Sequence, residues 1–211
     1  VSDSTGYATW SAIASGLTWA ADRGARVANI SFNGAAGSSS VLSAARYMKG
    51  KGGLVFVSAG NNNTDPNYAN TDDIIIVAAT TRSDTKASFS NFGDHVHLSA
   101  PGEGIYTTNW NQGYASVNGT SFAAPIAAGA AALVMAANPG LTNAQVQQIL
   151  FSTAVDLGAA GRDDIFGHGR VNAQAAVSAA VAMLPPAVDS QAPTVAIQAP
   201  LGAWQIGREH V

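Results

Sequence analysis

The fold is decided by the continuous apolar stretch Leu54-Val55-Phe56-Val57-Ser58-Ala59. Its length and its β-branched and aromatic residues predict a strand, and the lack of polar alternation predicts that both faces of this strand are covered. The stretch Ile74-Ile75-Ile76-Val77-Ala78-Ala79 has the same character, and residues 27–32 predict a shorter strand upstream. Strands of this kind are typical of a parallel sheet buried between helices.

Helical patterns separate and follow these strands. Apolar residues recur at helical spacing from Thr9 to Arg23, and Thr142 followed by Gln145 has the form of a capping box. The helices are predicted over residues 9–23, 39–51, 121–137, 142–152 and 172–182. The sequence therefore predicts an α/β fold of three layers, a parallel sheet flanked by helices.

Length and composition limit the domain organisation. The 211 residues are 47% hydrophobic and only 11% charged, which predicts one compact domain and excludes a disordered chain. We assign residues 1–183 to this domain and the Pro-containing residues 184–211 to a linker and tail. The chain begins at Val1 without Met or an apolar signal core, so no targeting segment is expected within it.

Charge and cysteine content exclude several functions. The net charge is −3 and basic residues are not clustered, so nucleic-acid binding is not expected. The chain has no cysteine, and catalysis would have to use hydroxyl, imidazole or carboxylate groups. No Asp, Glu, Lys or Arg occurs from Gly104 to Val155. Polar residues, Gly and Pro interrupt this segment too often for a membrane span, so it is predicted to lie inside the domain.

A candidate nucleophile lies where a glycine-containing turn meets the Ala-rich helix, in Asn118-Gly119-Thr120-Ser121-Phe122-Ala123-Ala124-Pro125. A hydroxyl at the start of a helix lies near unpaired backbone N–H groups and the positive end of the helix dipole. That setting suits a nucleophile whose product is an oxyanion. The alternative is that Ser121 only caps the helix, because serine is a favoured N-cap residue.

The stretch Gly119-Thr120-Ser121-Phe122-Ala123-Ala124-Pro125 resembles the Gly-Thr-Ser-x-Ala-x-Pro signature of the subtilisin-like serine proteases. Five more segments match blocks of that family in the same order, and the resemblance extends to about Ala182. They are residues 27–34, Val57-Ser58-Ala59-Gly60-Asn61, Ala87-Ser88-Phe89-Ser90-Asn91-Phe92-Gly93, Leu98-Ser99-Ala100-Pro101-Gly102 and Gly167-His168-Gly169-Arg170-Val171-Asn172-Ala173. The resemblance implies a subtilisin-like catalytic domain of which this chain is the C-terminal part.

Position by position, the resemblance implies that Ser121 attacks the scissile carbonyl. The Asn61 side chain and the Ser121 backbone N–H would donate to the oxyanion. An extended substrate would add to an exposed strand edge and place a side chain against a facing wall. The implied substrate-binding residues are Ser31, Phe32, Asn33, Gly34, Ser58, Ala59 and Gly60. The small wall residues predict room for a large apolar or aromatic side chain, although the family usually has Gly where Asn33 stands.

A serine nucleophile needs a base, and the base needs an acid that orients it. No motif of this chain matches the family's motifs for these two residues. The family carries its Asp and His in segments upstream of the first predicted helix. His95, His97, His168 and His210 do not follow that pattern, and structural roles are predicted for them. The pair Asp94-His95 lies in a stretch predicted to be strand-like, and it is the first pair to test if activity is found.

Two hypotheses follow. In one, the chain is part of a secreted subtilisin-like endopeptidase that acts on polypeptides. In the other, it stands alone as a reduced, esterase-like serine hydrolase or as an inert binding domain. Either the N-terminal half or a second copy is the expected protein partner, since a shared central sheet would leave an edge exposed.

No cofactor is assigned. Asn61-Asn62-Asn63-Thr64-Asp65 with Asp72-Asp73 offers oxygen ligands for calcium, but turn composition explains these residues equally well.

Overall fold

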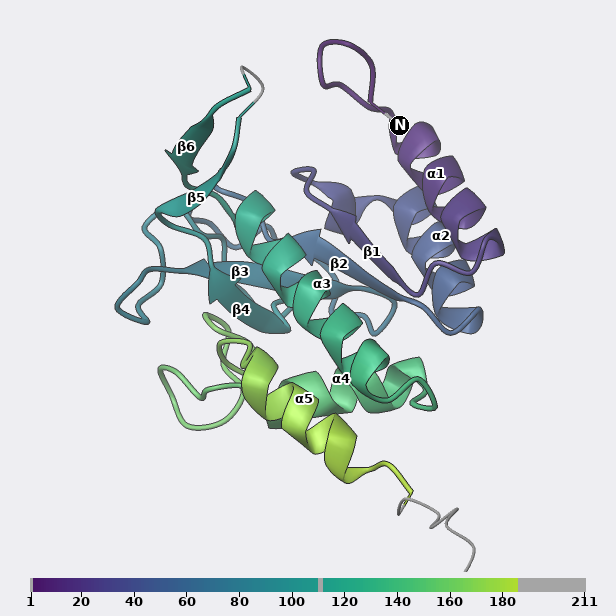
Figure 1. Ribbon diagram of the computed structural model, residues 1–211. Helices are drawn as coiled ribbons and strands as arrows, with labels where there is room; N and C mark the ends of the chain where they lie inside the picture. Colours follow the sequence, from purple (N-terminus) through teal and green to yellow (C-terminus); the bar gives the residue numbers. More distant parts are fainter. Residues whose placement is uncertain (1, 110–111, 186–211) are drawn as a thin grey trace, which may run out of the picture.

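The computed structural model describes residues 2–109 and 112–185, and Figure 1 shows their arrangement. Of the predicted linker and tail over 184–211, residues 186–211 lie outside the described residues. The elements in chain order are α1 (Trp10–Asp22), β1 (Val27–Ile30), η1 (Ala35–Gly37), α2 (Ser39–Gly50), β2 (Leu54–Ser58), β3 (Ile75–Thr80), β4 (Leu98–Pro101), β5 (Ile105–Thr108), β6 (Tyr114–Val117), α3 (Thr120–Ala137), α4 (Asn143–Ser152) and α5 (Ala173–Ala182).

The centre of the fold is a four-stranded sheet in the order β1-β2-β3-β4. All neighbouring strands in it are parallel, as the apolar stretches predicted. Every residue of β2 and of β3 is buried. Parallel strands are joined by crossovers that place helices on the faces of the sheet, so a strand in its middle has no solvent-facing side.

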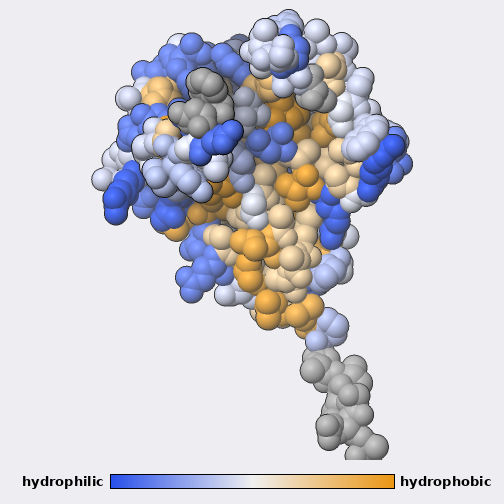
Figure 2. All heavy atoms as spheres, turned by 45° about the horizontal axis from the view of Figure 1, so that its top comes forward, coloured by the Kyte–Doolittle hydropathy of each residue, from blue (hydrophilic) through white to orange (hydrophobic). Residues whose placement is uncertain are grey.

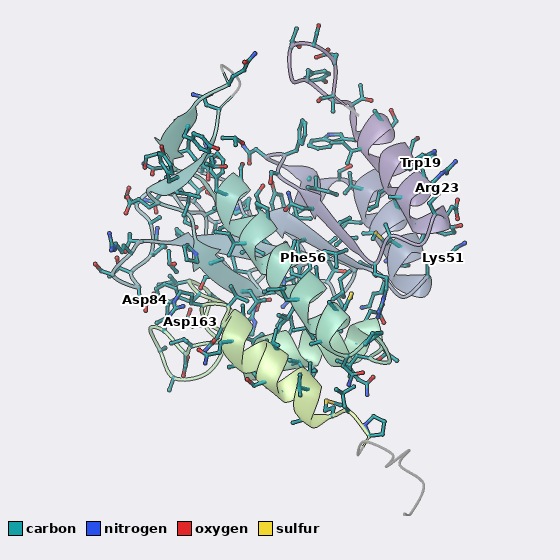
Figure 3. All side chains as sticks on the ribbon, in the orientation of Figure 1. Trp19, Arg23, Lys51, Phe56, Asp84 and Asp163 are labelled. Carbon is teal, nitrogen blue, oxygen red and sulfur yellow. The ribbon has the colours of Figure 1, made fainter. Side chains whose placement is uncertain are left out.

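Helices cover the two faces of the sheet, and the predicted three-layer architecture is confirmed. Phe56 of β2 belongs to the core under α3, α4 and α5, and Figure 3 labels it at this place. Its neighbour Val57 belongs to the core under α1 and α2. Successive strand residues point to opposite faces, and the single apolar stretch therefore supplies both cores.

Local signals fix the helix ends. The predicted capping box is present at the start of α4, where Gln145 N–H donates to Thr142 Oγ1 at 3.2 Å and Thr142 N–H donates to Gln145 Oε1 at 2.9 Å. In the described part of the chain only α3 is long and apolar enough to cross a membrane, and half of it is buried. It packs across β2, β3 and β4, as the core helix of a globular domain does.

The secondary structure differs from the sequence predictions at two places. Residues 94–98 are not strand-like, since Asp94 and His95 form a turn and β4 begins only at Leu98. His95, Val96 and His97 are all buried, so the alternation of polar and apolar residues does not correspond to alternating exposure. The hairpin of β5 and β6 was not predicted, although Gly113 precedes its second strand. It projects from the sheet beside the start of α3 (Figure 1).

Candidate active site

Ser121 is the second residue of α3, and its hydroxyl faces the end of β1. Ser121 Oγ lies 3.5 Å from the carbonyl oxygen of Ser31, and Ser31 Oγ donates in return to the carbonyl of Ser121 at 2.8 Å. The N-cap position is Gly119, not Ser121, so the alternative in which Ser121 only caps the helix does not hold. The half-buried hydroxyl of Ser121 is left for another role.

Asn61 follows the carboxyl end of β2, and Thr120 connects it to the start of α3. Asn61 Oδ1 accepts from the Thr120 backbone N–H at 2.9 Å and from Thr120 Oγ1 at 2.8 Å. Thr120 Oγ1 also accepts from the Gly60 N–H at 3.1 Å. With its oxygen held by two donors, the Asn61 amide turns its NH₂ group away from Thr120. The strand end and the helix start therefore converge at Thr120, the residue before Ser121.

Thr120 is a site residue whose role was not predicted from the sequence. Its side chain is completely buried, and it is the only residue between Gly119 and the nucleophile candidate. A hydroxyl buried at this depth needs partners, and both of them belong to the Gly60–Asn61 turn. The signal that could have identified it is its position within the Gly-Thr-Ser motif.

The first turn of α3 provides a second donor. The Ser121 backbone N–H has no acceptor within the part of the chain that the structure describes, as expected for the first turn of a helix. The positive end of the helix dipole lies at the same place. Together with the Asn61 NH₂ group, this N–H can stabilise negative charge on an oxygen bound beside Ser121.

The two predicted substrate walls lie in different surroundings. Ser58 and Ala59 are buried, with 4% and 2% of their surface exposed, whereas Asn33 is exposed. The Asn33 carboxamide crosses toward the opposite wall. Its Oδ1 would lie 2.9 Å from a Cβ placed on Gly60, and its Nδ2 is 3.4 Å from Asn62 Oδ1. The structure therefore brings Asn33 and Gly60 together, and the amide narrows the space between the walls.

The described histidines have partners away from Ser121. His95 is 1% exposed, with its Nδ1 3.7 Å from Asp65 Oδ1, and burial lowers its pKa. Burial lowers the pKa of His97 to about 4. His168 stacks on Phe151 with ring centroids 4.3 Å apart. No histidine hydrogen-bonds Ser121 within residues 2–109 and 112–185, and His210 lies outside them.

Several of the oxygens considered for calcium have protein partners. Asn61 Oδ1 accepts from Thr120, Asn63 Oδ1 accepts from Lys86, and Asp73 pairs with Arg46 at 2.7 Å. The described residues contain no group of three or more His, Asp or Glu side chains arranged for a metal ion.

The fold and the site together define a class. A serine hydroxyl and amide donors meet at the carboxyl edge of a parallel sheet in a three-layer α/β domain, which is the arrangement of a serine-hydrolase site. Comparison with known proteins identifies the family. The sequence matches the Subtilase family over residues 2–169, and the chain belongs to that family.

Named relatives agree with this assignment. The chain is 41% identical to thermitase from Thermoactinomyces vulgaris over 179 residues, which cover 84% of this chain and 63% of the relative. It is 40% identical to alkaline elastase YaB from Bacillus sp. (strain YaB), covering 82% of this chain and 45% of the relative. The chain thus spans about half to two thirds of these relatives.

A solved structure has the same fold. The crystal structure of a lanthipeptide protease superposes with a TM-score of 0.72 at 25% sequence identity. The match covers 84% of this chain and 69% of that chain. The similarity extends over most of the described elements, so this chain has the subtilisin-like fold in part of its extent.

Proposed function

We propose that this chain carries the nucleophile and the oxyanion hole of a subtilisin-like serine endopeptidase. The observation that supports this most is that two hydrogen bonds hold Asn61 against Thr120, the residue that precedes Ser121. Family membership and the relatives named as proteases support a polypeptide substrate. The same relatives are the reason for placing the protein outside the cell.

In the proposed reaction, Ser121 Oγ attacks the carbonyl carbon of the scissile peptide bond. The C–O bond forms as the carbonyl π electrons move onto the oxygen, which then accepts hydrogen bonds from Asn61 Nδ2 and the Ser121 N–H. Collapse of this intermediate expels the amine and leaves an acyl group on Ser121. Water then releases the acid in a second attack.

The proton of the Ser121 hydroxyl needs a base, and the leaving amine needs that proton back. The described histidines do not reach Ser121, so in the proposal an Asp and a His outside this chain's matched motifs supply the base. The finer alternatives remain an esterase-like hydrolase that stands alone and an inert binding domain. An oxyanion hole without its base retains some rate enhancement, so activated esters would be the substrates of such a reduced enzyme.

A fluorophosphonate label tests the proposal because it bonds covalently to an activated serine. Labelling is measured on this chain and on any longer polypeptide of the same gene, each compared with its Ser121→Ala variant. Ser116→Ala, which removes an exposed hydroxyl of β6, is the matched control. We expect fast, stoichiometric labelling of the longer polypeptide that is lost only with Ser121. Fast labelling of this chain alone favours the reduced hydrolase, and no labelling of either favours the inert domain.

The partner in this proposal is the part of a subtilase domain that the relatives have beyond the matched stretch. Among the described strands, β1 pairs only with β2. Beside its outer edge lies a mainly apolar groove of about 210 Å³, lined by α1 and β1 residues that include Ile13, Leu17, Ala28 and Ile30. An unpaired strand edge next to an apolar groove suits a further parallel strand with its helix. A second copy of the chain is the other possible occupant.

The oligomeric state of the purified chain tests this partner. We expect self-association or aggregation of the chain alone, and a one-to-one complex when the remaining part of the domain is co-expressed. Size-exclusion chromatography with light scattering distinguishes these outcomes from a defined dimer. A soluble monomer that does not bind the added part would contradict the proposed partner.

A further inference from the structure

Asn91 is a buried polar residue to which the proposed reaction assigns no role. It lies between β3 and β4 with 3% of its surface exposed. Its carboxamide makes three hydrogen bonds, and all of them go to the turn that carries Asn61. Nδ2 donates to the Ala59 carbonyl at 3.0 Å, while Oδ1 accepts from the Asn62 N–H at 2.9 Å and the Thr64 N–H at 3.2 Å.

The backbone of residues 59–64 wraps around this carboxamide. Gly60 has φ +105°, a conformation that residues with a Cβ rarely adopt, and a Cβ there would collide with Asn91 Nδ2. The Asn91 N–H also donates to the Gly60 carbonyl at 3.0 Å. The side chain therefore lies within this turn and binds the chain on both sides of Asn61.

Asn61 is consequently held from two directions. Thr120 fixes its side-chain oxygen, and Asn91 fixes the backbone before and after it. A displacement of this backbone would move the Asn61 NH₂ group away from an oxygen bound at Ser121. Hydrogen-bond donors stabilise an oxyanion only when they are held in place before charge develops.

We propose that Asn91 is a positioning residue that sets the direction of the oxyanion-binding amide of Asn61. Asn91 does not touch the reacting atoms. Its effect on rate rests on the proposed function, whereas its effect on the Asn61 turn does not. The structural part of the proposal can therefore be tested even if Ser121 proves unreactive.

Ser90 supplies a matched control. It is fully buried like Asn91 and uses its hydroxyl twice, accepting from the Ala79 N–H at 2.9 Å and donating to the Asn91 carbonyl at 3.0 Å. None of these bonds reaches residues 59–64. Ser90→Ala thus removes buried hydrogen bonds in the same segment and leaves the bonds to the Asn61 turn intact.

Amide hydrogen exchange and the NMR signals of the Asn61 side chain test the proposal in the full chain. In Asn91→Ala we expect exchange at the Asn62 and Thr64 amides to rise at least about tenfold relative to Asn63, whose N–H donates to the Phe89 carbonyl. The Asn61 NH₂ signals should shift or broaden. Ser90→Ala should leave both readouts unchanged. Unchanged Asn61 signals in Asn91→Ala would overturn the proposal.

Asn91→Asp keeps the proposal testable if the alanine variant does not fold. An ionised carboxylate still accepts from Asn62 and Thr64 but faces the Ala59 carbonyl without a proton to donate. When the pH falls and this carboxyl is protonated, its O–H can donate to Ala59 again. We expect the native Asn61 signals to return in a single-proton titration, and failure to return at any pH would contradict the proposed contact.

Hydrolysis of an activated ester adds the catalytic readout. If Asn91 acts by positioning, kcat falls in Asn91→Ala while KM changes little, and Ser90→Ala behaves like the unmodified chain. A disturbed Asn61 signal with an unchanged kcat would refute the catalytic part. If neither the unmodified chain nor any longer polypeptide hydrolyses the ester, this result counts against the proposed function. The NMR measurements would still decide the role of Asn91.

Discussion

Acid pH should destabilise this protein through His97, which is buried without a partner for its second ring nitrogen. Its Nδ1 accepts from the Ile76 N–H at 3.1 Å, so the neutral ring is the form that fits. Nε2 has no hydrogen-bond partner among the described residues. Burial lowers the pKa of His97 to about 4, with Arg162 contributing in the same direction and Asp72 opposing.

The size of the effect follows from proton linkage. In the unfolded chain the pKa of a histidine is about 6.5, so below that pH the unfolded state binds a proton that the folded state excludes. Because the folded pKa is lower, stability is lost as the pH falls from about 6.5 toward about 4 and then levels off. Between about pH 7 and about pH 4.5 the loss from His97 should be about 2 kcal/mol.

Urea unfolding at a series of pH values measures this loss. The comparison variant is His97→Asn, which keeps an acceptor near the position of Nδ1 and does not titrate in this range. We expect it to be less stable near pH 7 but to lose about 2 kcal/mol less on acidification. His95, His168 and the carboxylates are present in both proteins, so their contributions cancel. Equal pH dependence of the two proteins would refute the reasoning.

Three other predictions concern single residues. Thr120→Val should lower the free energy of unfolding, measured with urea, by about 2 kcal/mol, because the buried Gly60 N–H loses its acceptor. Thr120→Ser should keep both hydrogen bonds of the hydroxyl, and equal stability of the two variants would contradict this prediction. Gly167→Ala should strongly lower the midpoint of thermal unfolding, because Gly167 has φ +63° and the new Cβ would collide with the His97 backbone. Gly161 has φ +83° and a Cβ placed on it meets no atom within 4 Å, so Gly161→Ala measures the cost of the backbone conformation alone. Asn33→Gly removes the amide beside Gly60, so in the complete protease it should raise kcat/KM for peptides with an aromatic residue before the scissile bond relative to peptides with alanine there. If the ratio of the two kcat/KM values is unchanged, Asn33 does not limit the pocket.

The exposed surface adds features that the sequence did not single out. Figure 3 places Trp19, Arg23 and Lys51 on the outer side of the α1 and α2 layer, and Arg23 lies over the Trp19 ring at 3.8 Å. Figure 2 shows apolar residues gathered where the described chain ends. Val181, Met183 and Leu184 are among the exposed apolar residues of this region. Amphipathic spacing alone does not distinguish such exposed positions from core positions.

Much of the fold could be read from particular stretches. Leu54–Ala59 and Ile74–Ala79 are too apolar and too β-branched for anything but covered strands, and Thr142 with Gln145 marks the start of a helix chemically. The failures have a physical reason as well. Polar and apolar residues alternate from Asp94 to Leu98 as in a strand, but tertiary contacts bury His95, Val96 and His97 alike, so the alternation does not correspond to alternating exposure. The strands β5 and β6 have only four residues each, which is too short for a clear period.

By itself, the sequence determined the layer architecture and the motif that carries Ser121, because local periodicity and a contiguous signature need no knowledge of distant contacts. The tertiary structure alone decided that Thr120 links Asn61 to the helix start, that Asn91 fills the Asn61 turn, and that the Asn33 amide approaches Gly60. Each of these contacts joins residues about 30 to 60 positions apart. Their geometry depends on how the strands and helices pack, and no local pattern of side chains records it.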